Sequence, residues 1–549
     1  MLVSPPTNAG TTLERTSQIP SIAHGVMVHD TTGAPGERGA VQYPPRVRGA
    51  IIKRVRGGVP AIALVMLALF FSPVLADPPA PPVDINTTPP TLTPFAGDTA
   101  IEDRLDPASH VMIAGERLHE HLVRRFYAAH GWQTAWDRHS DVAAALGAEV
   151  LRADRQGLDP AAFHALSLGG RGRALSAIDR DLLLSDAILS YADALAQGAV
   201  PVGDRPDDED LRPEPIDVVA VIDAAISAPD PAETIAALAP NAPEYAAMRR
   251  AYADYLTLAA SGGTGAEIGA YDPVPRLSVA EALRRARQIA INLERMRWLP
   301  RDLPRDRLIV DAAVSQLQLF RDDVPVFTTR VVIGEVDKQT PELQSVVKFV
   351  LFNPPWNIPP SIVKKEILPK LAADHHYLAE HHMRWRGPMS VQQEAGPYSA
   401  LGRLKFEIND RFDVYLHDTP ERWRFQAAYR MMSHGCVRVE NPRELASLLL
   451  GESPQAIDQA INSNRTYRRA LPKPLPVFIV YRTAVVESDG SVAFRGDPYD
   501  RDAVIWAHLS RARELRLVQK STPGSTDKVR AGQVSSTKAQ KTAIIETSP

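Results

Sequence analysis

The spacing of the hydrophobic residues changes near residue 307, and this change limits the possible folds more than any other feature of the sequence. From about Ile101 to Leu258 apolar residues recur at helical intervals, whereas from Arg307 onward they alternate as in β-strands. Strand patterns without intervening helices favour an antiparallel or mixed sheet, because parallel strands need long crossover connections. We therefore predict an α+β fold in which a helical domain precedes a β-sheet domain.

Glycines close three of the expected helices, because glycine readily adopts the left-handed conformation that ends a helix. These helices are expected over 116–131, 141–157 and 180–198, followed by helical segments over 215–238 and 243–260 and by a connecting helix of about twenty residues that ends near Trp298. Their aliphatic stripes indicate a packed core.

The strand patterns predict hairpins. The segments 307–323 and 324–334 form one, turning at Asp322 and Asp323, and 401–410 pairs with 411–418 around Asn409-Asp410-Arg411. A further strand is expected over 345–354 and a last hairpin over 476–497. Asn441 and Pro442 are typical of the N-cap and first position of a helix, which we expect to run through Leu450.

The stretch Tyr415–Arg438 carries the chemistry. It contains the only cysteine of the chain, Cys436, directly after Ser433-His434-Gly435, and His417 lies 19 residues upstream. A nucleophilic thiol needs a base and needs hydrogen-bond donors aimed at the oxyanion that it creates. Gly435 would let its own amide and that of Cys436 point at one acceptor.

Alternation in this stretch predicts which way the histidine faces. Phe412, Val414 and Leu416 share one face of the expected strand, so His417 lies on the other face, presented away from the core. The alternative is an inert buried cysteine beside a core histidine. Serine, histidine and glycine next to the thiol are poor core formers, which disfavours that alternative.

The combination of a histidine, a spacer of fifteen residues and Ser-His-Gly-Cys resembles the signature of the L,D-transpeptidase catalytic domain of the YkuD type. The segments FYAAHGWQTAW, ADRQGLDP and ILSYADALAQG resemble the N-terminal scaffold of the large, YcbB-like L,D-transpeptidases. The resemblance covers about Ile101–Asp502. It implies a peptidoglycan enzyme that acts on donor and acceptor stem peptides and requires no metal or organic cofactor.

The resemblance also implies roles for residues of the site. Cys436 would be the nucleophile and His417 the base, with its ring oriented by a backbone carbonyl near Asp418. The amides of Gly435 and Cys436 would form the oxyanion hole, and Ser433 would brace the turn. For His434 three roles stay open: binding substrate, assisting the thiolate, or shaping the loop.

Other residues would contact the substrate. Arg438 suits a carboxylate of the stem peptide through a bidentate contact, the alternative being a surface salt bridge. Tyr415 and Trp356 either line the cleft or belong to the core. Where the family carries an asparagine before Leu-Gly, this chain has Ser399, so the contacts of that loop are open.

A long insertion over 354–397 resembles the lid of the YcbB-like enzymes, and loops of this length are usually functional. We expect it to be mobile and separate from the rigid sheet. It contains four histidines, but their spacing does not give i,i+4 pairs and no cysteine is near, so solvated lid histidines are favoured over a metal site. These histidines are His375, His376, His381 and His382.

Export follows from the N-terminal part of the chain. Lys53, Arg54 and Arg56 precede the apolar run Val59–Phe71, which is short for a membrane span, and Ala76 ends a typical cleavage site. We expect a periplasmic protein, associated with the inner membrane if this segment is retained. A net charge of -3 does not favour nucleic acid, and one cysteine excludes an intramolecular disulfide.

These observations divide the chain into seven parts. They are a 1–50 extension that suggests a start codon placed too far upstream, a 51–76 signal peptide or anchor, a 77–97 proline-rich linker, a 98–275 helical scaffold domain, a 276–306 connecting helix, a 307–502 catalytic domain with the lid, and a 503–549 short helix and disordered tail. A separate peptidoglycan-binding module has no room between scaffold and catalytic domain, so we expect none.

The acyl acceptor stays open between a second stem, a lipoprotein lysine and water, and a non-catalytic peptidoglycan-binding protein is the remaining alternative.

Overall fold

The computed structural model describes residues 99–106, 110–169, 175–262, 277–487 and 489–511. All of them belong to one compact unit, Pro82–Pro549. The expected extension, signal segment, linker and C-terminal tail lie outside the described residues, as does most of the junction at 263–276 where we expected no binding module. None of the helices in the described part is both long and apolar enough to cross a membrane.

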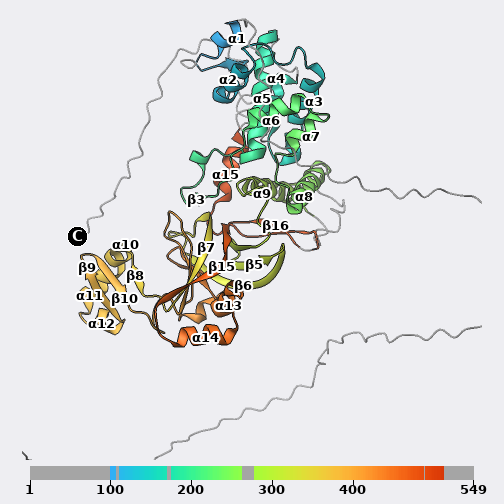
Figure 1. Cartoon of the computed structure of the whole chain (residues 1–549). Coiled ribbons are helices and arrows are strands. Elements are labelled where there is room, and N and C mark those ends of the chain that lie inside the picture. Colours follow the sequence, from blue (N-terminus) through green and yellow to red (C-terminus); the bar gives the residue numbers. More distant parts are fainter. Residues whose placement is uncertain (1–98, 107–109, 170–174, 263–276, 488, 512–549) are drawn as a thin grey trace, which may run out of the picture. The chain divides into compact units, whose positions relative to one another are not determined.

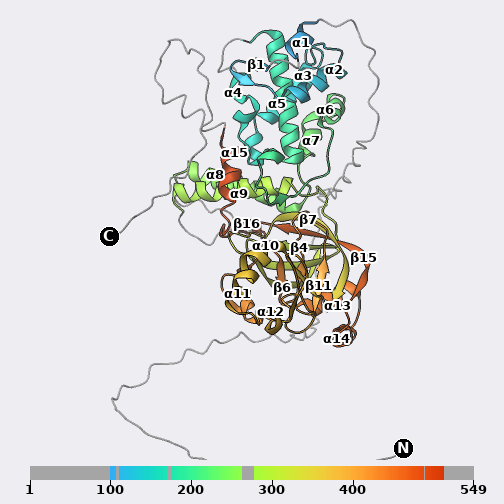
Figure 2. The ribbon, with the colours of Figure 1, turned by 90° about the vertical axis from the view of Figure 1, so that its left-hand side faces the viewer.

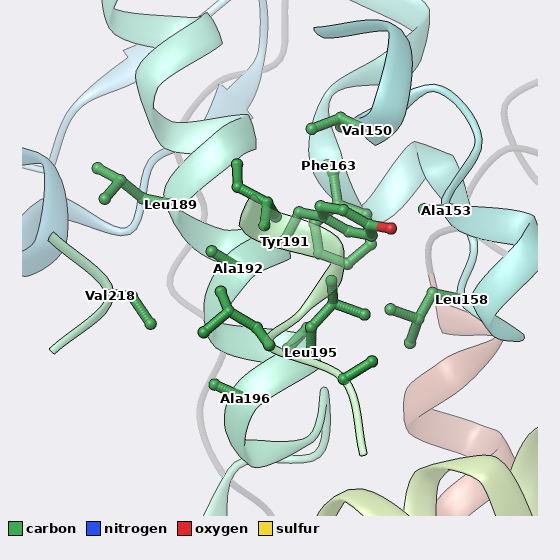
Figure 3. Close-up of a cluster of buried hydrophobic side chains, with 14 of the residues drawn as sticks. Val150, Ala153, Leu158, Phe163, Leu189, Tyr191, Ala192, Leu195, Ala196 and Val218 are labelled. Carbon is green, nitrogen blue, oxygen red and sulfur yellow. The ribbon is translucent and has the colours of Figure 1, made fainter. Parts of the chain in front are cut away.

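The first part of the unit is helical, as predicted. Its elements are α1 Thr99–Arg104, β1 Met112–Ile113, β2 Glu116–Arg117, α2 Glu120–Ala129, α3 Ser140–Val150, α4 Ala165–Leu168, α5 Ala177–Gln197, β3 Glu209–Asp210, α6 Val218–Ile226, α7 Pro231–Ala236 and α8 Pro243–Ala260. Figure 3 shows side chains of α5, among them Tyr191 and Leu195, in one apolar cluster with Val150 of α3 and Phe163. The core of this domain is therefore built around α5.

The predicted glycine ends are found, with one difference. Gly157 and Gly198 directly follow helical segments and have positive φ angles of 72° and 91°. However, α3 ends at Val150, and a 3-10 turn over Ala153–Gln156 fills the space before Gly157. The helix expected to reach Gly157 is thus two segments.

Helix α9, Val279–Arg297, is the predicted connecting helix and lies beside α8 (Figure 2). Its polar side chains hold the catalytic domain. Gln288 Nε2 donates to the carbonyl oxygens of Thr483 and Arg495 at 2.6 and 2.8 Å, and Arg295 pairs with Asp502 at 2.6 Å. Buried hydrogen bonds of this kind fix the position of one domain on the other, because each group left unpaired would be costly.

The second part is a mixed sheet. Its strands are β4 Arg307–Asp311, β5 Gln316–Arg321, β6 Val324–Gly334, β7 Glu342–Phe352, β11 Leu404–Glu407, β12 Leu416–His417, β13 Met431–Ser433, β14 Val437–Val439 and β15 Tyr467–Val480. They follow the order β11-β12-β14-β6-β5-β4-β15-β7-β3, and β11 also pairs with β7, so the strands close on themselves around an apolar core. The scaffold contributes β3, which pairs in parallel with β7.

The predicted β-hairpins are found in modified form. Asp322 and Asp323 form the β5–β6 turn with φ angles of 48° and 64°, but 307–323 contains two strands, not one. In 411–418 only Leu416–His417 is a strand, because Asp413 has a φ of 57° and the Asp410 carboxylate accepts the amides of Phe412 and Val414. Val414 and Leu416 are nevertheless in the core, as alternation predicted.

The C-terminal predictions also need adjustment. Helix α13, Pro442–Leu450, begins and ends as expected, yet the Asn441 side chain does not cap it and donates instead to the Thr329 hydroxyl at 3.1 Å. Strands β16 Ala484–Val486 and β17 Val492–Phe494 form the last hairpin, while the preceding residues belong to β15. Helix α14 covers Pro454–Asn462, and a short helix α15 covers Asp502–Leu509.

The expected lid is a small subdomain of its own. Its elements are β8 Trp356–Ile358, α10 Pro360–Ile362, a π-helical turn Val363–Ile367, α11 Leu368–Ala373, α12 Tyr377–Glu380, β9 Met383–Gly387 and β10 Ser390–Gln393. They form a separate sheet, β8-β10-β9 (Figure 1), and their side chains form a separate apolar cluster around Val363 and Ile367. The lid is therefore not part of the main sheet, as predicted, and its mobility stays a prediction.

Candidate active site

Strands β12 and β14 bring the predicted catalytic residues together. They pair in parallel with Leu416 opposite Val437 and His417 opposite Arg438. Residues opposite each other in a sheet share a face, and alternate residues along a strand do so too. His417 and Cys436 therefore project from one face, diagonally across the two strands, while Leu416 and Val437 enter the core on the other face.

The His417 ring is held in one orientation. Its Nδ1 donates to the backbone carbonyl of Asp418 at 2.5 Å, as the family resemblance implied, so Nε2 is left to accept a proton. His417 is only 4% exposed. We expected it to face away from the core; it does lie on the opposite face, but it is buried there.

Burial keeps this imidazole neutral. Desolvation of the ring, reinforced by the positive charges of Arg438 and Lys405, lowers the pKa of His417 to about 3. A neutral imidazole is the form that can take a proton from a thiol. At every pH near neutrality the His417 ring is therefore in the form that can accept a proton.

A hydroxyl braces the turn before the cysteine. Ser433 is 1% exposed, and its Oγ donates to the carbonyl of Cys436 at 2.6 Å while it accepts the amide of Gly435 at 3.2 Å. The Thr340 hydroxyl donates to the Gly435 carbonyl at 2.8 Å. The turn is therefore fixed from both sides, which places the sulfur.

The backbone at Gly435 bears on the expected oxyanion hole. Gly435 has the positive φ, 108°, that favours glycine, as expected. Its amide donates to the Ser433 hydroxyl inside the turn at 3.2 Å. The paired use of these two amides as an oxyanion hole stays a prediction, and in this structure the serine hydroxyl accepts the first of them.

The thiol of Cys436 lies in a protected but partly accessible position. Its Sγ approaches the Asp413 carbonyl at 3.9 Å, and burial raises the pKa of the Cys436 thiol above its usual value. Hydrogen bonds with Tyr415 and the charge of Lys405 act in the opposite direction and favour the thiolate. Burial therefore favours a thiol and a neutral histidine over an ion pair of thiolate and imidazolium.

Arg438 does not present a free guanidinium in this structure. Its Nη1 donates to Glu421, which also forms a bidentate ion pair with Arg424 at 2.9 and 3.0 Å. The alternative that we named, a salt bridge, is therefore what the structure contains, although the Arg438 side chain is largely buried. Its Nε has no hydrogen-bond partner among the described residues.

Asp418 contributes its backbone and not its carboxylate to the site. The carboxylate oxygens accept the amides of Arg403 and Thr419, each at 2.8 Å, and pair with Arg422 at 3.1 Å. We also expected Asp418 among the residues that contact the substrate; that role stays a prediction, and here both of its carboxylate oxygens are engaged within the protein. Gly402, with a φ of 59°, lets the chain approach so closely that a Cβ there would lie 2.4 Å from the Asp418 Cγ.

The lid contacts the site through two residues. Trp356 interacts with the Tyr415 side chain, and Tyr415 in turn interacts with Cys436 and stacks edge-on against His417, with ring centroids 5.6 Å apart. His434 Nε2 pairs with Glu366 of the lid, which lies 3.9 Å from Lys338 as well. His434 therefore lies where the lid meets the catalytic turn. The three roles named for it above stay open.

Two residues of the site were missed by sequence reasoning. Lys405 on β11 lies opposite His417, and Glu366 contacts His434. For Lys405 the available signal was a lysine between Leu404 and Phe406 in an apolar strand. Nothing in the local sequence identified Glu366. Ser399, which replaces the family asparagine, is fully buried and accepts the amide of Leu401 at 3.3 Å.

A cleft of about 470 Å³ lies beside Asp418 and is lined by Arg403, Thr419, Arg422 and Arg443 among others. Neither Cys436 nor His417 lines it, so it is distinct from the reacting face. The described residues contain no group of three or more histidine, cysteine or acidic side chains arranged for a metal ion.

Solved structures with similar chains include an L,D-transpeptidase from Mycobacterium smegmatis, at 12% identity and a TM-score of 0.18 over 32% of this chain and 58% of that one. L,D-transpeptidase 3 from Mycobacterium tuberculosis with a faropenem-derived adduct matches at 11% identity and 0.18, over 32% and 60%. The "Putative L,D-transpeptidase" of Haemophilus influenzae is 33% identical over 241 residues, 40% of this chain and 48% of that protein. The chain spans about half the length of this curated relative.

Two families match separate parts of the chain. Residues 305–479 match the L,D-transpeptidase catalytic domain, YkuD, and residues 121–251 match the Scaffold domain. The first match contains His417 and Cys436, and the second covers the helices packed around α5. The chain therefore joins a scaffold domain to a YkuD L,D-transpeptidase catalytic domain, the architecture of the YcbB-like L,D-transpeptidases.

Proposed function

We propose that this protein makes 3→3 cross-links in peptidoglycan. The donor is a tetrapeptide stem, from which the enzyme takes the acyl group of diaminopimelate and releases the terminal D-Ala. The acceptor is the side-chain amine of diaminopimelate in a second stem. The periplasm, where peptidoglycan lies, is the proposed compartment.

One observation supports this proposal above all others: a lone cysteine and a neutral, oriented histidine project from the same face of two paired strands. In the first step Cys436 Sγ attacks the diaminopimelate carbonyl while His417 Nε2 accepts the thiol proton. The tetrahedral adduct collapses to a thioester, and His417 returns that proton to the leaving amine of D-Ala.

The second step reverses the proton transfers. The acceptor amine attacks the thioester carbonyl, His417 takes a proton from it, and the thiol leaves protonated. Until the acceptor amine binds, water must be kept from the thioester, because water would hydrolyse it. The lid suits that task, because Trp356 and Glu366 reach the residues around the sulfur.

The test is mass spectrometry of the products after incubation of the full-length protein with a defined tetrapeptide donor. We expect a cross-linked dimer and free D-Ala, and a Cys436→Ala variant should form neither. Tripeptide alone would replace the proposal with hydrolysis. Products that appear only with a lipoprotein acceptor would replace it with lipoprotein attachment.

Incubation with a carbapenem separates catalysis from simple binding. A stoichiometric mass increase on Cys436 is expected, because an active thiol forms a covalent adduct with the β-lactam carbonyl. Binding to peptidoglycan without any adduct would favour a non-catalytic binding protein.

A further inference from the structure

Lys405 lies in the reacting face without a carboxylate partner. Strand β11 pairs with β12 so that Lys405 stands opposite His417, and its Nζ lies 3.8 Å from the centroid of the Tyr415 ring. The nearest acidic residue on its own strand, Glu407, is held by Arg468 at 2.7 Å. Within the described residues no carboxylate comes within ion-pair distance of this ammonium.

Such a placement has a cost. Burial lowers the pKa of Lys405, which means that its charged form is poorly solvated at this position. A lysine stem could cover apolar surface and still extend its ammonium into water. Here the ammonium instead rests on an aromatic face, where a ring attracts a cation through its quadrupole.

Tyr415 connects this cation to the sulfur. Its side chain interacts with the Cys436 thiol and with Trp356 of the lid. A cation on the ring face draws electron density from the phenol, and this makes its O–H a stronger donor. The chain of contacts runs from Lys405 through the ring of Tyr415 to Cys436.

We propose that Lys405 and Tyr415 act as a pair that stabilises the Cys436 thiolate, Tyr415 as the hydrogen-bond donor to the sulfur and Lys405 as the positioning residue that charges and holds the ring. The thiol proton goes to His417 Nε2, and Tyr415 keeps its own. This inference rests on the proposed function in so far as Cys436 is taken as the nucleophile.

The other charged groups around the sulfur explain why such a pair is needed. The charge of Asp410 and the carbonyl of Asp413 disfavour a negative charge on the sulfur of Cys436, and burial of the thiol disfavours it as well. Arg438, on the same strand as the sulfur, already forms an ion pair with Glu421. Neutral His417 supplies no charge, and Arg468 is engaged by Glu407, so Lys405 is the cation that remains to balance the thiolate.

The experiment measures the rate of alkylation of the full-length protein by iodoacetamide between about pH 5 and 11. Lys405→Met keeps the apolar stem and removes the charge, and we expect the apparent pKa of the thiol to rise by about one unit, with alkylation at pH 7 about tenfold slower. Lys405→Arg keeps the positive charge and should retain the wild-type dependence of alkylation on pH. Lys348→Met, at an exposed lysine on the neighbouring strand β7, should leave it unchanged.

The relay is tested by Tyr415→Phe, alone and combined with Lys405→Met. We expect the lysine substitution to have little further effect once the hydroxyl is gone. An unchanged profile for a folded Lys405→Met protein, checked by circular dichroism, would overturn the proposal. Additive shifts in the double variant would overturn the relay through Tyr415.

Alkylation does not depend on a donor or an acceptor peptide. Failure of the protein to form cross-links would therefore contradict the proposed function and leave this inference untouched. Conversely, normal cross-linking with an unshifted thiol profile in Lys405→Met would contradict only this inference.

Discussion

Replacing His417 by asparagine should change how the stability of the protein depends on pH. The substitution retains an N–H that can donate to the Asp418 carbonyl, where His417 Nδ1 donates at 2.5 Å, and it removes the group that titrates. Because burial lowers the pKa of His417 to about 3, the folded protein resists a proton that the unfolded chain accepts below about pH 6.5.

The magnitude follows from linkage. At pH 7.5 the histidine is neutral in both states and contributes nothing to the pH dependence. As the pH falls below the unfolded pKa, the unfolded state gains a proton and the folded state does not, so stability is lost until the folded pKa near 3 is reached. At pH 5, about 1.5 units below the unfolded value, the loss is about 2 kcal/mol.

Urea denaturation of the full-length protein at pH 7.5 and pH 5.0 measures this loss. The wild type should lose about 2 kcal/mol more of its unfolding free energy between the two pH values than His417→Asn does. His375→Asn removes an exposed lid histidine and should behave like the wild type. An equal loss in wild type and His417→Asn would refute the view that burial holds the base neutral.

Further outcomes can be measured directly. Carbapenem acylation of Cys436 should show no acid limb near pH 6.5, because His417 stays neutral down to about pH 3; a limb there would mean that the base titrates normally. Glu366→Gln weakens the contact between lid and catalytic turn. The ratio of tripeptide to cross-linked product should therefore rise by up to about fivefold, the limit for one partly exposed ion pair. An unchanged ratio would show that this contact does not contribute to lid closure. Gly402→Ala should lower the melting temperature and slow acylation, since its Cβ would overlap Asp418 at 2.4 Å from Cγ; wild-type stability would show that the chain can relax there.

Local pattern in the sequence was enough to indicate the candidate reacting residues and the faces on which they lie. The alternation of Val414, Leu416 and His417 predicts which side chains enter the core even though only Leu416–His417 forms regular strand. Helix ends at glycines and the turn at Asp322-Asp323 were predictable for the same reason. Each depends on the preferences of a few neighbouring residues, which the sequence contains in full.

The tertiary structure decided which groups meet across the site. Parallel pairing of β12 with β14 sets His417 against Arg438, and pairing with β11 brings in Lys405. Glu366 reaches His434 from 68 residues away, and Glu421 takes the guanidinium that we expected to bind substrate. Strand partners and ion pairs of this kind depend on how distant segments pack, because many pairings satisfy the same local pattern and only the closed sheet with its lid selects among them.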